Sequence, residues 1–280
     1  RQLADQVGAE IGQVILGKQA EIQLAFTCLL AGGHLLIEDV PGVGKTLLAR
    51  SLAGVLGLSF RRIQFTSDML PADIVGMSIL EQATSTFRFH PGPIFSHVVL
   101  ADEINRATPK AQSALLEAME EHQVTLAGHT HALPAPFFVI ATQNPLHQTG
   151  TFPLPESQLD RFLMRIGLGY PGEVLERKLL RGDDRRTMLG ELRPVVDVAG
   201  LTALRAAARE LFLSDALLDY VQALVRFTRQ SAQFDLGLSP RGAQDLVNAA
   251  RCRALIHGHP GVHPEDVKAV FGAVAGHRLR

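Results

Sequence analysis

The spacing of apolar residues divides the chain into two regions. In the first region, short continuous apolar runs of strand length recur, and stretches with helical spacing separate several of them. Buried apolar strands that alternate with helices are typical of a mainly parallel β-sheet with helices on its faces. The predicted strands cover residues 34–37, 60–65, 98–101, 137–141 and 162–166, and the clearest predicted helices cover residues 18–30, 109–121 and a segment that begins at Lys45.

The second region follows Tyr170, Pro171 and Gly172 and has the pattern of a helical domain. Apolar runs of strand length cease there, and the sequence predicts four helices at residues 199–211, 215–230, 240–256 and 264–275. Because a Pro-Gly pair interrupts regular structure, it marks a hinge between two regions. The sequence therefore predicts an α/β core of residues 1–169, followed by a small all-helical domain of residues 170–280.

Two segments interrupt the alternation of strands and helices within the predicted core. Residues 73–95 contain two alternating runs around a polar turn at residues 82–85. Residues 122–134 have the pattern of a hairpin that turns at Ala127 and Gly128. Loops and hairpins of this kind, presented by a rigid sheet, tend to make contacts with partners.

The strongest chemical pattern in the chain is DVPGVGKT, residues 39–46. It follows a predicted strand and opens a predicted helix, which is the context that a phosphate-binding loop requires. Its glycines let backbone N–H groups turn toward phosphates, and the helix N-terminus adds partial positive charge. In this interpretation Lys45 reaches the β- and γ-phosphates and Thr46 binds Mg²⁺. Asp39 stands in place of the usual first glycine, and the competing interpretation is a Gly/Pro turn that leaves Lys45 solvated.

Polar residues also follow two later predicted strands. In VVLADE, residues 98–103, Asp102 is predicted to hold Mg²⁺ and Glu103 to orient and deprotonate the attacking water. In VIATQNP, residues 139–145, Asn144 is predicted to position that water against the γ-phosphate. Each has a structural alternative, because acidic pairs often cap helices and Asn before Pro often forms a turn. The phosphate loop upstream favours the functional interpretation of all three.

Two arginines are candidates for stabilising the charge that develops on a transferring phosphoryl group. Arg161 precedes a predicted strand, and Arg241 lies at the start of a predicted helix. A lone surface arginine more often forms a solvated ion pair. Composition alone therefore selects neither residue.

Composition narrows the functional classes. The chain has 27 basic and 28 acidic residues and a formal net charge of −1, which disfavours a dedicated nucleic-acid binder. Its two cysteines, Cys28 and Cys252, lie far apart in predicted helices and indicate reduced core thiols. No apolar run reaches transmembrane length and no signal-peptide pattern is present, so we expect a cytoplasmic protein without a transmembrane segment.

Four motifs together resemble one known family. They are EDVPGVGKT at residues 38–46, DEINRA at 102–107, ATQNP at 141–145 and LPESQLDRF at 154–162. In this order they closely resemble the MoxR group of AAA+ ATPases, and the resemblance runs from Val14 to the C-terminal end. An acidic residue at the position of Asp39 is familiar in this group.

The resemblance implies a fold and a set of roles. It implies a P-loop AAA+ core and a helical lid, with residues 73–95 as the helix-2 insert and residues 122–134 as the pre-sensor hairpin. It implies that Asn144 is sensor 1, Arg241 sensor 2, and Arg161 the arginine finger that acts on a neighbouring subunit, with Arg106 and Arg165 as alternatives for the finger. The implied nucleotide-binding residues, of which the first three pack on adenine, are Val14, Ile15, Gly17, Val40, Pro41, Gly42, Val43, Gly44, Lys45, Thr46 and Leu47.

The resemblance also implies an oligomeric state and a biochemical function. The expected architecture is a ring, usually a hexamer, that uses ATP and Mg²⁺. The expected function is chaperone-like remodelling or maturation of protein clients, including metal-cofactor insertion, often with a von Willebrand factor A domain partner. Two alternatives stay open. A DNA-directed AAA+ motor or loader is disfavoured because residues 123–134 contain no Lys or Arg. A slowly hydrolysing ATP-dependent switch is disfavoured because Lys45, Asp102, Glu103 and Asn144 are all present.

Overall fold

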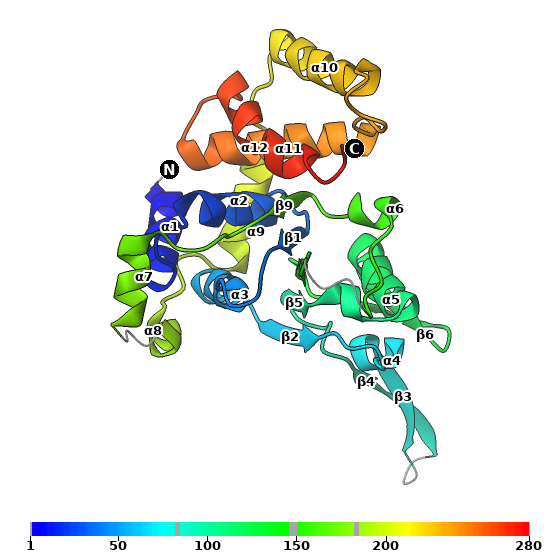
Figure 1. Ribbon diagram of the computed structural model, residues 1–280. Coiled ribbons are helices and arrows are strands. Elements are labelled where there is room, and N and C mark those ends of the chain that lie inside the picture. Colours follow the sequence, from blue (N-terminus) through cyan, green and yellow to red (C-terminus); the bar gives the residue numbers. More distant parts are fainter. Residues whose placement is uncertain (1, 82–84, 146–149, 182–184, 280) are drawn as a thin grey trace.

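A five-stranded parallel sheet forms the centre of the molecule (Figure 1). The computed structural model describes residues 2–81, 85–145, 150–181 and 185–279. The order of the strands is β2-β5-β8-β1-β9, and every neighbouring pair is parallel. This arrangement confirms the predicted α/β class. The strands are β1 Leu35–Glu38, β2 Phe60–Gln64, β5 Val98–Asp102, β8 Phe138–Gln143 and β9 Met164–Ile166.

Successive strand residues enter two separate apolar cores, because side chains along a strand alternate between the faces of a sheet. On one face Leu35 and Ile37 pack with helices α1 (Gln2–Val14), α2 (Gln19–Leu30) and α3 (Lys45–Val55). On the other face Leu36 packs with α4 (Pro71–Val75) and α5 (Pro109–Glu121). The helix α1 was not predicted, since its sequence is polar and mixed. Its buried residues Val7 and Ile11 recur at helical spacing.

Both segments that interrupt the core form antiparallel hairpins. Strands β3 (Gly76–Glu81) and β4 (Thr86–Pro91) pair in the first, and β6 (Gln123–Leu126) and β7 (His129–Ala132) in the second. The rings of Phe89 and His131 stack with centroids 3.8 Å apart and so join the two hairpins. Residues 82–84 of the predicted polar turn lie outside the described residues.

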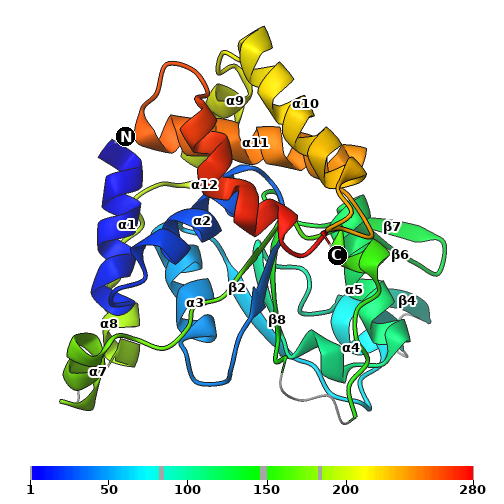
Figure 2. The ribbon, with the colours of Figure 1, turned by 45° about the horizontal axis from the view of Figure 1, so that its top comes forward.

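A helical unit covers the end of the core that lies away from the two hairpins (Figure 2). Helix α11 packs against α12, α9 and α2, and α12 packs against β9. The predicted helices of the second region are present as α9 (Val198–Arg209), α10 (Asp215–Gln230), α11 (Pro240–His257) and α12 (Pro264–Ala275). Side chains of Asp197, Ser214 and Ser239 cap three of them. Of the described helices, none is long and apolar enough to cross a membrane.

Several short helices connect these parts. They are η1 (Ile104–Arg106), α6 (Glu156–Leu159), α7 (Glu173–Leu180) and α8 (Arg185–Glu191). Helix α8 packs against α1 and α3, and Leu175 of α7 lies against Gly17. The chain beyond residue 170 therefore first returns to the core before it enters the four-helix unit. The boundary between residues 169 and 170 stays a prediction.

The buried side chain of Arg278 fastens the end of the chain to the core. Its guanidinium donates hydrogen bonds to Asp160 and Asp245 and to the carbonyl oxygens of Phe162 and Leu163. The side chain is 3% exposed, so its charge depends on these partners in place of water. This contact fixes the segment before β9 against α11 and α12.

Candidate functional site

The phosphate-loop pattern forms an open turn between β1 and α3. Gly42 and Gly44 have φ angles of 86° and 98°, in the left-handed region that favours glycine. A Cβ at either position would meet no atom within 4 Å, so open space lies beside the backbone there. The loop borders a cavity of about 710 Å³, whose lining residues are Pro41, Gly42, Gly44, Lys45, Thr46, Leu47, Arg50, Arg62, Gln64, Asp102, Glu103, Asn144 and Leu189.

Asp39 fastens this loop to the chain that leaves the last strand. Its Oδ1 accepts a hydrogen bond from Val40 N at 2.7 Å. Its Oδ2 accepts from Leu168 N at 2.6 Å and from Gly169 N at 2.5 Å. A glycine at this position could not make these contacts. The departure from the usual loop sequence therefore supplies an anchor between the loop and the segment after β9.

Lys45 lies inside the loop with its ammonium group turned toward the backbone. Its Nζ donates to the carbonyl oxygen of Asp39 at 2.5 Å. Partial burial lowers the pKa of Lys45 from its ordinary value, while the carboxylates of Asp39, Asp102 and Glu103 oppose that shift. A group held in this way is partly stripped of water and close to the position that phosphates would occupy.

Asp102 ends β5 with both carboxylate oxygens engaged. Oδ1 accepts a hydrogen bond from the hydroxyl of Thr142 at 2.6 Å. Oδ2 accepts two from Arg62, at 3.0 Å from Nε and 2.6 Å from Nη2. Asp102 and Thr46 line the cavity and present oxygen atoms to it, and oxygen ligands suit Mg²⁺. This donor chemistry fits the predicted metal, while Arg62 occupies one oxygen of the pair in this arrangement.

Glu103 follows in a left-handed backbone conformation, with φ of 57°. Such a conformation is uncommon for a residue other than glycine and is concentrated at functional sites. Here the N–H of Glu103 donates to Thr142 Oγ1 at 2.9 Å. The side chain accepts from Arg106 at 2.9 Å and from Gln64 at 3.2 Å. Thr142 therefore holds the backbone of Glu103, while Arg106 and Gln64 hold its carboxylate.

Sequence interpretation missed the contributions of Arg62, Gln64 and Thr142. The pairing of β2 with β5 would have indicated the first two, because its register places Gln64 opposite Asp102. That pairing could be inferred only after the strand order was known. Thr142 lies one residue before the predicted amide run and is 1% exposed. Its role depends on the neighbouring strand, which no local pattern reveals.

Other predicted nucleotide-binding residues lie outside the cavity lining. Val14 and Ile15 are buried in the apolar core that also contains residues of α3, and Gly17 lies against Leu175, where a Cβ would come within 2.1 Å of Cδ1. Val40 and Val43 belong to the loop without lining the cavity. Leu189 of α8 lines the cavity instead. The predicted contacts of Val14, Ile15 and Gly17 with adenine stay predictions.

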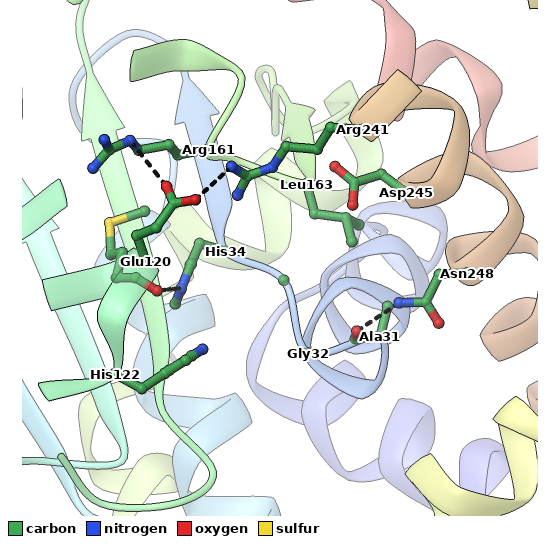
Figure 3. A pocket seen from close by; sticks show the side chains of 12 residues that line it. Ala31, Gly32, His34, Glu120, His122, Arg161, Leu163, Arg241, Asp245 and Asn248 are labelled. Atoms are coloured by element: carbon green, nitrogen blue, oxygen red, sulfur yellow. Dashed lines mark hydrogen bonds and ion pairs between the residues drawn. The ribbon is translucent and has the colours of Figure 1, made fainter. Parts of the chain in front are cut away.

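The two predicted arginines meet on Glu120 (Figure 3). They lie where the strands of the sheet begin, away from the phosphate loop, which lies where β1 ends. Arg161 Nε lies 3.2 Å from Glu120 Oε2, and Arg241 Nη1 lies 2.9 Å from Glu120 Oε1. They border a smaller cavity of about 150 Å³ that also includes Gly33 and His34, which precede β1. The phosphate loop follows β1 at its other end. A strand rises about 3.3 Å per residue, so His34 and Asp39 are roughly 16 Å apart.

The two arginines offered as alternatives have other partners. Arg106 pairs with Glu103, which lines the larger cavity. Arg165 pairs with Glu38 at 2.9 Å and donates to the carbonyl oxygen of Gly276. Neither lies in the cluster around Glu120.

The parallel sheet, the open glycine loop and the acidic residues at the end of β5 define an ATPase of the AAA+ class. Residues 34–164 match the family model described as "ATPase family associated with various cellular activities (AAA)", and residues 226–280 match the AAA lid domain. The crystal structure of a proposed ATPase from Cytophaga hutchinsonii superposes with a TM-score of 0.90 at 37% identity, covering 100% of this chain and 87% of that one.

Relatives narrow the class further. Chaperone MoxR1 of Mycobacterium tuberculosis is 40% identical, over 96% of this chain and 74% of the relative. Protein MoxR of Methylorubrum extorquens is 33% identical, over 100% of this chain and 88% of the relative. The chain belongs to the MoxR family of AAA+ ATPases.

Proposed function

We propose that this chain binds ATP with Mg²⁺ and hydrolyses it at the cavity beside the phosphate loop. The observation that carries the proposal is that one cavity is lined by Lys45, Thr46, Asp102, Glu103 and Asn144, which come from three separate stretches of sequence. Hydrolysis needs phosphate binding, metal coordination, a base and a group that orients water, and these side chains offer each of them.

The proposed roles follow from the positions of the side chains. Backbone N–H groups of residues 42–47 and the ammonium group of Lys45 bind the phosphates. Mg²⁺, held by Thr46 and Asp102, would neutralise charge on the phosphate oxygens. Glu103 takes the proton from the attacking water, and Asn144 orients that water. Arg62 must release Asp102 for metal coordination, since one carboxylate oxygen cannot fully serve both.

We also propose that Arg161 and Arg241 act on the nucleotide of a neighbouring subunit. Both lie beside Glu120 at the edge of the sheet where β1 begins, whereas the phosphate loop lies where β1 ends. A side chain of Arg extends only about 7 Å, less than the rise of β1. A ring, such as the hexamer expected for this family, would bring the arginine edge of one subunit against the loop of the next.

The proposed work is remodelling or maturation of protein clients. The relative named Chaperone MoxR1 supports the chaperone-like part of this proposal. Metal-cofactor insertion and a von Willebrand factor A domain partner are finer expectations that the family suggests. The hairpin of β6 and β7 carries no Lys or Arg, so a DNA-directed motor remains the less favoured alternative.

The decisive experiment measures steady-state ATP turnover against protein concentration, with mass by light scattering in the presence and absence of ATP. Turnover per subunit that rises with concentration, together with a ring-sized species, supports an active site shared between subunits. Turnover by a monomer, independent of concentration, would remove the shared site and favour an ATP-dependent switch. Stimulation of turnover by single-stranded or duplex DNA would favour the DNA-directed alternative.

A further inference from the structure

The C-terminal turns of α5 carry three carboxylates and no basic residue of their own. They are Glu117, Glu120 and Glu121. The C-terminus of a helix carries partial negative charge, so carboxylates there are unfavourable unless cations compensate them. For Glu120, the compensating cations come from distant parts of the chain.

Glu120 receives two cations, one on each oxygen. Arg161 approaches Oε2 through Nε at 3.2 Å, and its Nη1 also donates to the carbonyl oxygen of Leu116 at 2.6 Å. Arg241 approaches Oε1 through Nη1 at 2.9 Å. One carboxylate therefore sets the separation of two guanidinium groups that come from the segment before β9 and from α11. Figure 3 shows the two arginines converging on it from opposite sides.

The helix end that carries Glu120 is itself fixed to the sheet. His34 Nε2 donates to the carbonyl oxygen of Met119 at 3.2 Å, and its Nδ1 accepts from Val139 N at 3.0 Å. His34 is buried, and burial lowers its pKa to about 3, so the ring is neutral with the proton on Nε2. The residue next to Glu120 is thus tied to β8, and Glu120 starts from a fixed backbone position.

The ion pairs leave donors of both arginines uncommitted. Arg161 uses Nε and Nη1, and Arg241 uses Nη1, so Nη2 of each group makes no hydrogen bond within the described part of the chain. We propose that Glu120 is a positioning residue that presents Arg161 and Arg241 together to the γ-phosphate of a neighbouring subunit. The inference rests on the proposed trans action of the arginines.

Weak ion pairs between Glu120 and the two arginines suit this positioning role. The side chains of Arg161, Arg241 and Glu120 are 32%, 45% and 38% exposed, and ion pairs of this exposure are weak. A phosphate group that carries more charge competes with the carboxylate easily. Glu120 orders two long side chains before the phosphate arrives, and misplacement of such groups by about 1 Å can lower a rate by up to a hundredfold.

The test replaces Glu120 and follows turnover and assembly separately. Glu120→Ala is expected to lower kcat about tenfold, while KM for ATP, affinity for a fluorescent ATP analogue and ring mass by light scattering stay unchanged. Glu121→Ala removes the same charge from the same helix end and serves as the matched control. It is expected to turn over like the wild type.

Two combinations decide whether Glu120 acts through the arginines. Added to Arg161→Ala/Arg241→Ala, the change Glu120→Ala is expected to have no further effect on kcat. In mixed rings, subunits with Glu103→Gln still present their arginines, so adding Glu120→Ala to those subunits should lower turnover by their wild-type neighbours.

The outcomes separate this inference from the function on which it rests. Faster turnover by Glu120→Ala would mean that the carboxylate restrains the arginines, and a tenfold loss that persists without the arginines would mean that it acts elsewhere. Either result overturns the inference alone, as does wild-type turnover by Glu120→Ala when the arginine variants are impaired. Wild-type turnover by Arg161→Ala/Arg241→Ala would overturn the trans action and the inference together.

Discussion

The parallel sheet carries two clusters of charged side chains that are built differently. One lies where its strands end, here called the first edge, and the other lies where its strands begin, here called the second edge. At the edge where strands end, Lys45, Asp102 and Glu103 lie within or next to short motifs. At the edge where strands begin, Glu120, Arg161 and Arg241 come from α5, the segment before β9 and α11. The first cluster is local in sequence and the second depends on tertiary packing. We expect the first to control chemistry within a subunit and the second to act between subunits.

The largest expected effect concerns the base at the first edge. Glu103→Gln keeps the size of the side chain and removes its ability to accept a proton from water. We expect ATP turnover to fall by about a thousandfold, or roughly 4 kcal/mol in activation free energy, because general-base catalysis contributes on the order of 10²–10⁴. Single-turnover hydrolysis measures the loss, and binding of a fluorescent ATP analogue should stay near the wild-type affinity.

A Glu103→Gln variant with normal turnover would assign the activation of water to another group. The first cluster would then bind nucleotide without supplying the base. Loss of nucleotide binding in this variant would instead mean that Gln64 and Arg106, which contact Glu103, shape the cavity through its charge.

The next prediction concerns the second edge and pH. The pKa of His34 falls from its ordinary value of 6.5 to about 3, first because burial disfavours the charged ring. The unfolded chain therefore binds more protons at intermediate pH. His34 contributes stability that is fully present above pH 6.5 and is lost as pH falls toward 3, at about 1.4 kcal/mol per pH unit. His277, with a pKa of about 4, acts in the same direction.

Urea unfolding at pH 7.5, 6.0 and 5.0 measures this dependence. His34→Asn should lower stability at pH 7.5, because the contact with Met119 is lost, and should make the dependence on pH shallower. The exposed residue His129 offers a matched control, and His129→Asn should keep the wild-type slope. An unchanged slope in His34→Asn would show that other groups carry the loss at acid pH.

The difference between the edges also explains what the sequence could predict. The phosphate loop, the residues Asp102 and Glu103, and the alternation of strands and helices are short-range patterns, and the five parallel strands were predicted within a few residues. Arg161 and Arg241 both contact Glu120, and Arg241 is 121 residues away from Glu120 in the sequence. No local sequence pattern predicts a contact between residues so far apart in the chain. Helices α7 and α8 were missed for a related reason, since their packing on α1 and α3 follows from tertiary contacts.

A smaller effect is expected at Asp39, where the first edge is anchored. Asp39→Asn keeps the shape of the side chain but replaces one oxygen with an amide that cannot accept hydrogen bonds. One or two of the bonds to Val40, Leu168 and Gly169 should be lost, at a cost of about 2 kcal/mol in unfolding free energy. Thermal unfolding without nucleotide measures this, and Asp235→Asn, at an exposed position, controls for the charge. Equal stability of the two variants would show that the anchor contributes little.

The smallest effect that the comparison predicts is competition between Arg62 and Mg²⁺ for Asp102. Arg62 is about half exposed, so its ion pair contributes only about 1 kcal/mol. Arg62→Ala should therefore lower the Mg²⁺ concentration for half-maximal turnover by about fivefold, because the carboxylate no longer has to be released. Arg61→Ala is the matched control, since neighbouring residues of a strand point to opposite faces. A higher Mg²⁺ requirement in Arg62→Ala would mean that Arg62 orients Asp102 for the metal, and the first edge would then resemble the second in using an ion pair to position its functional group.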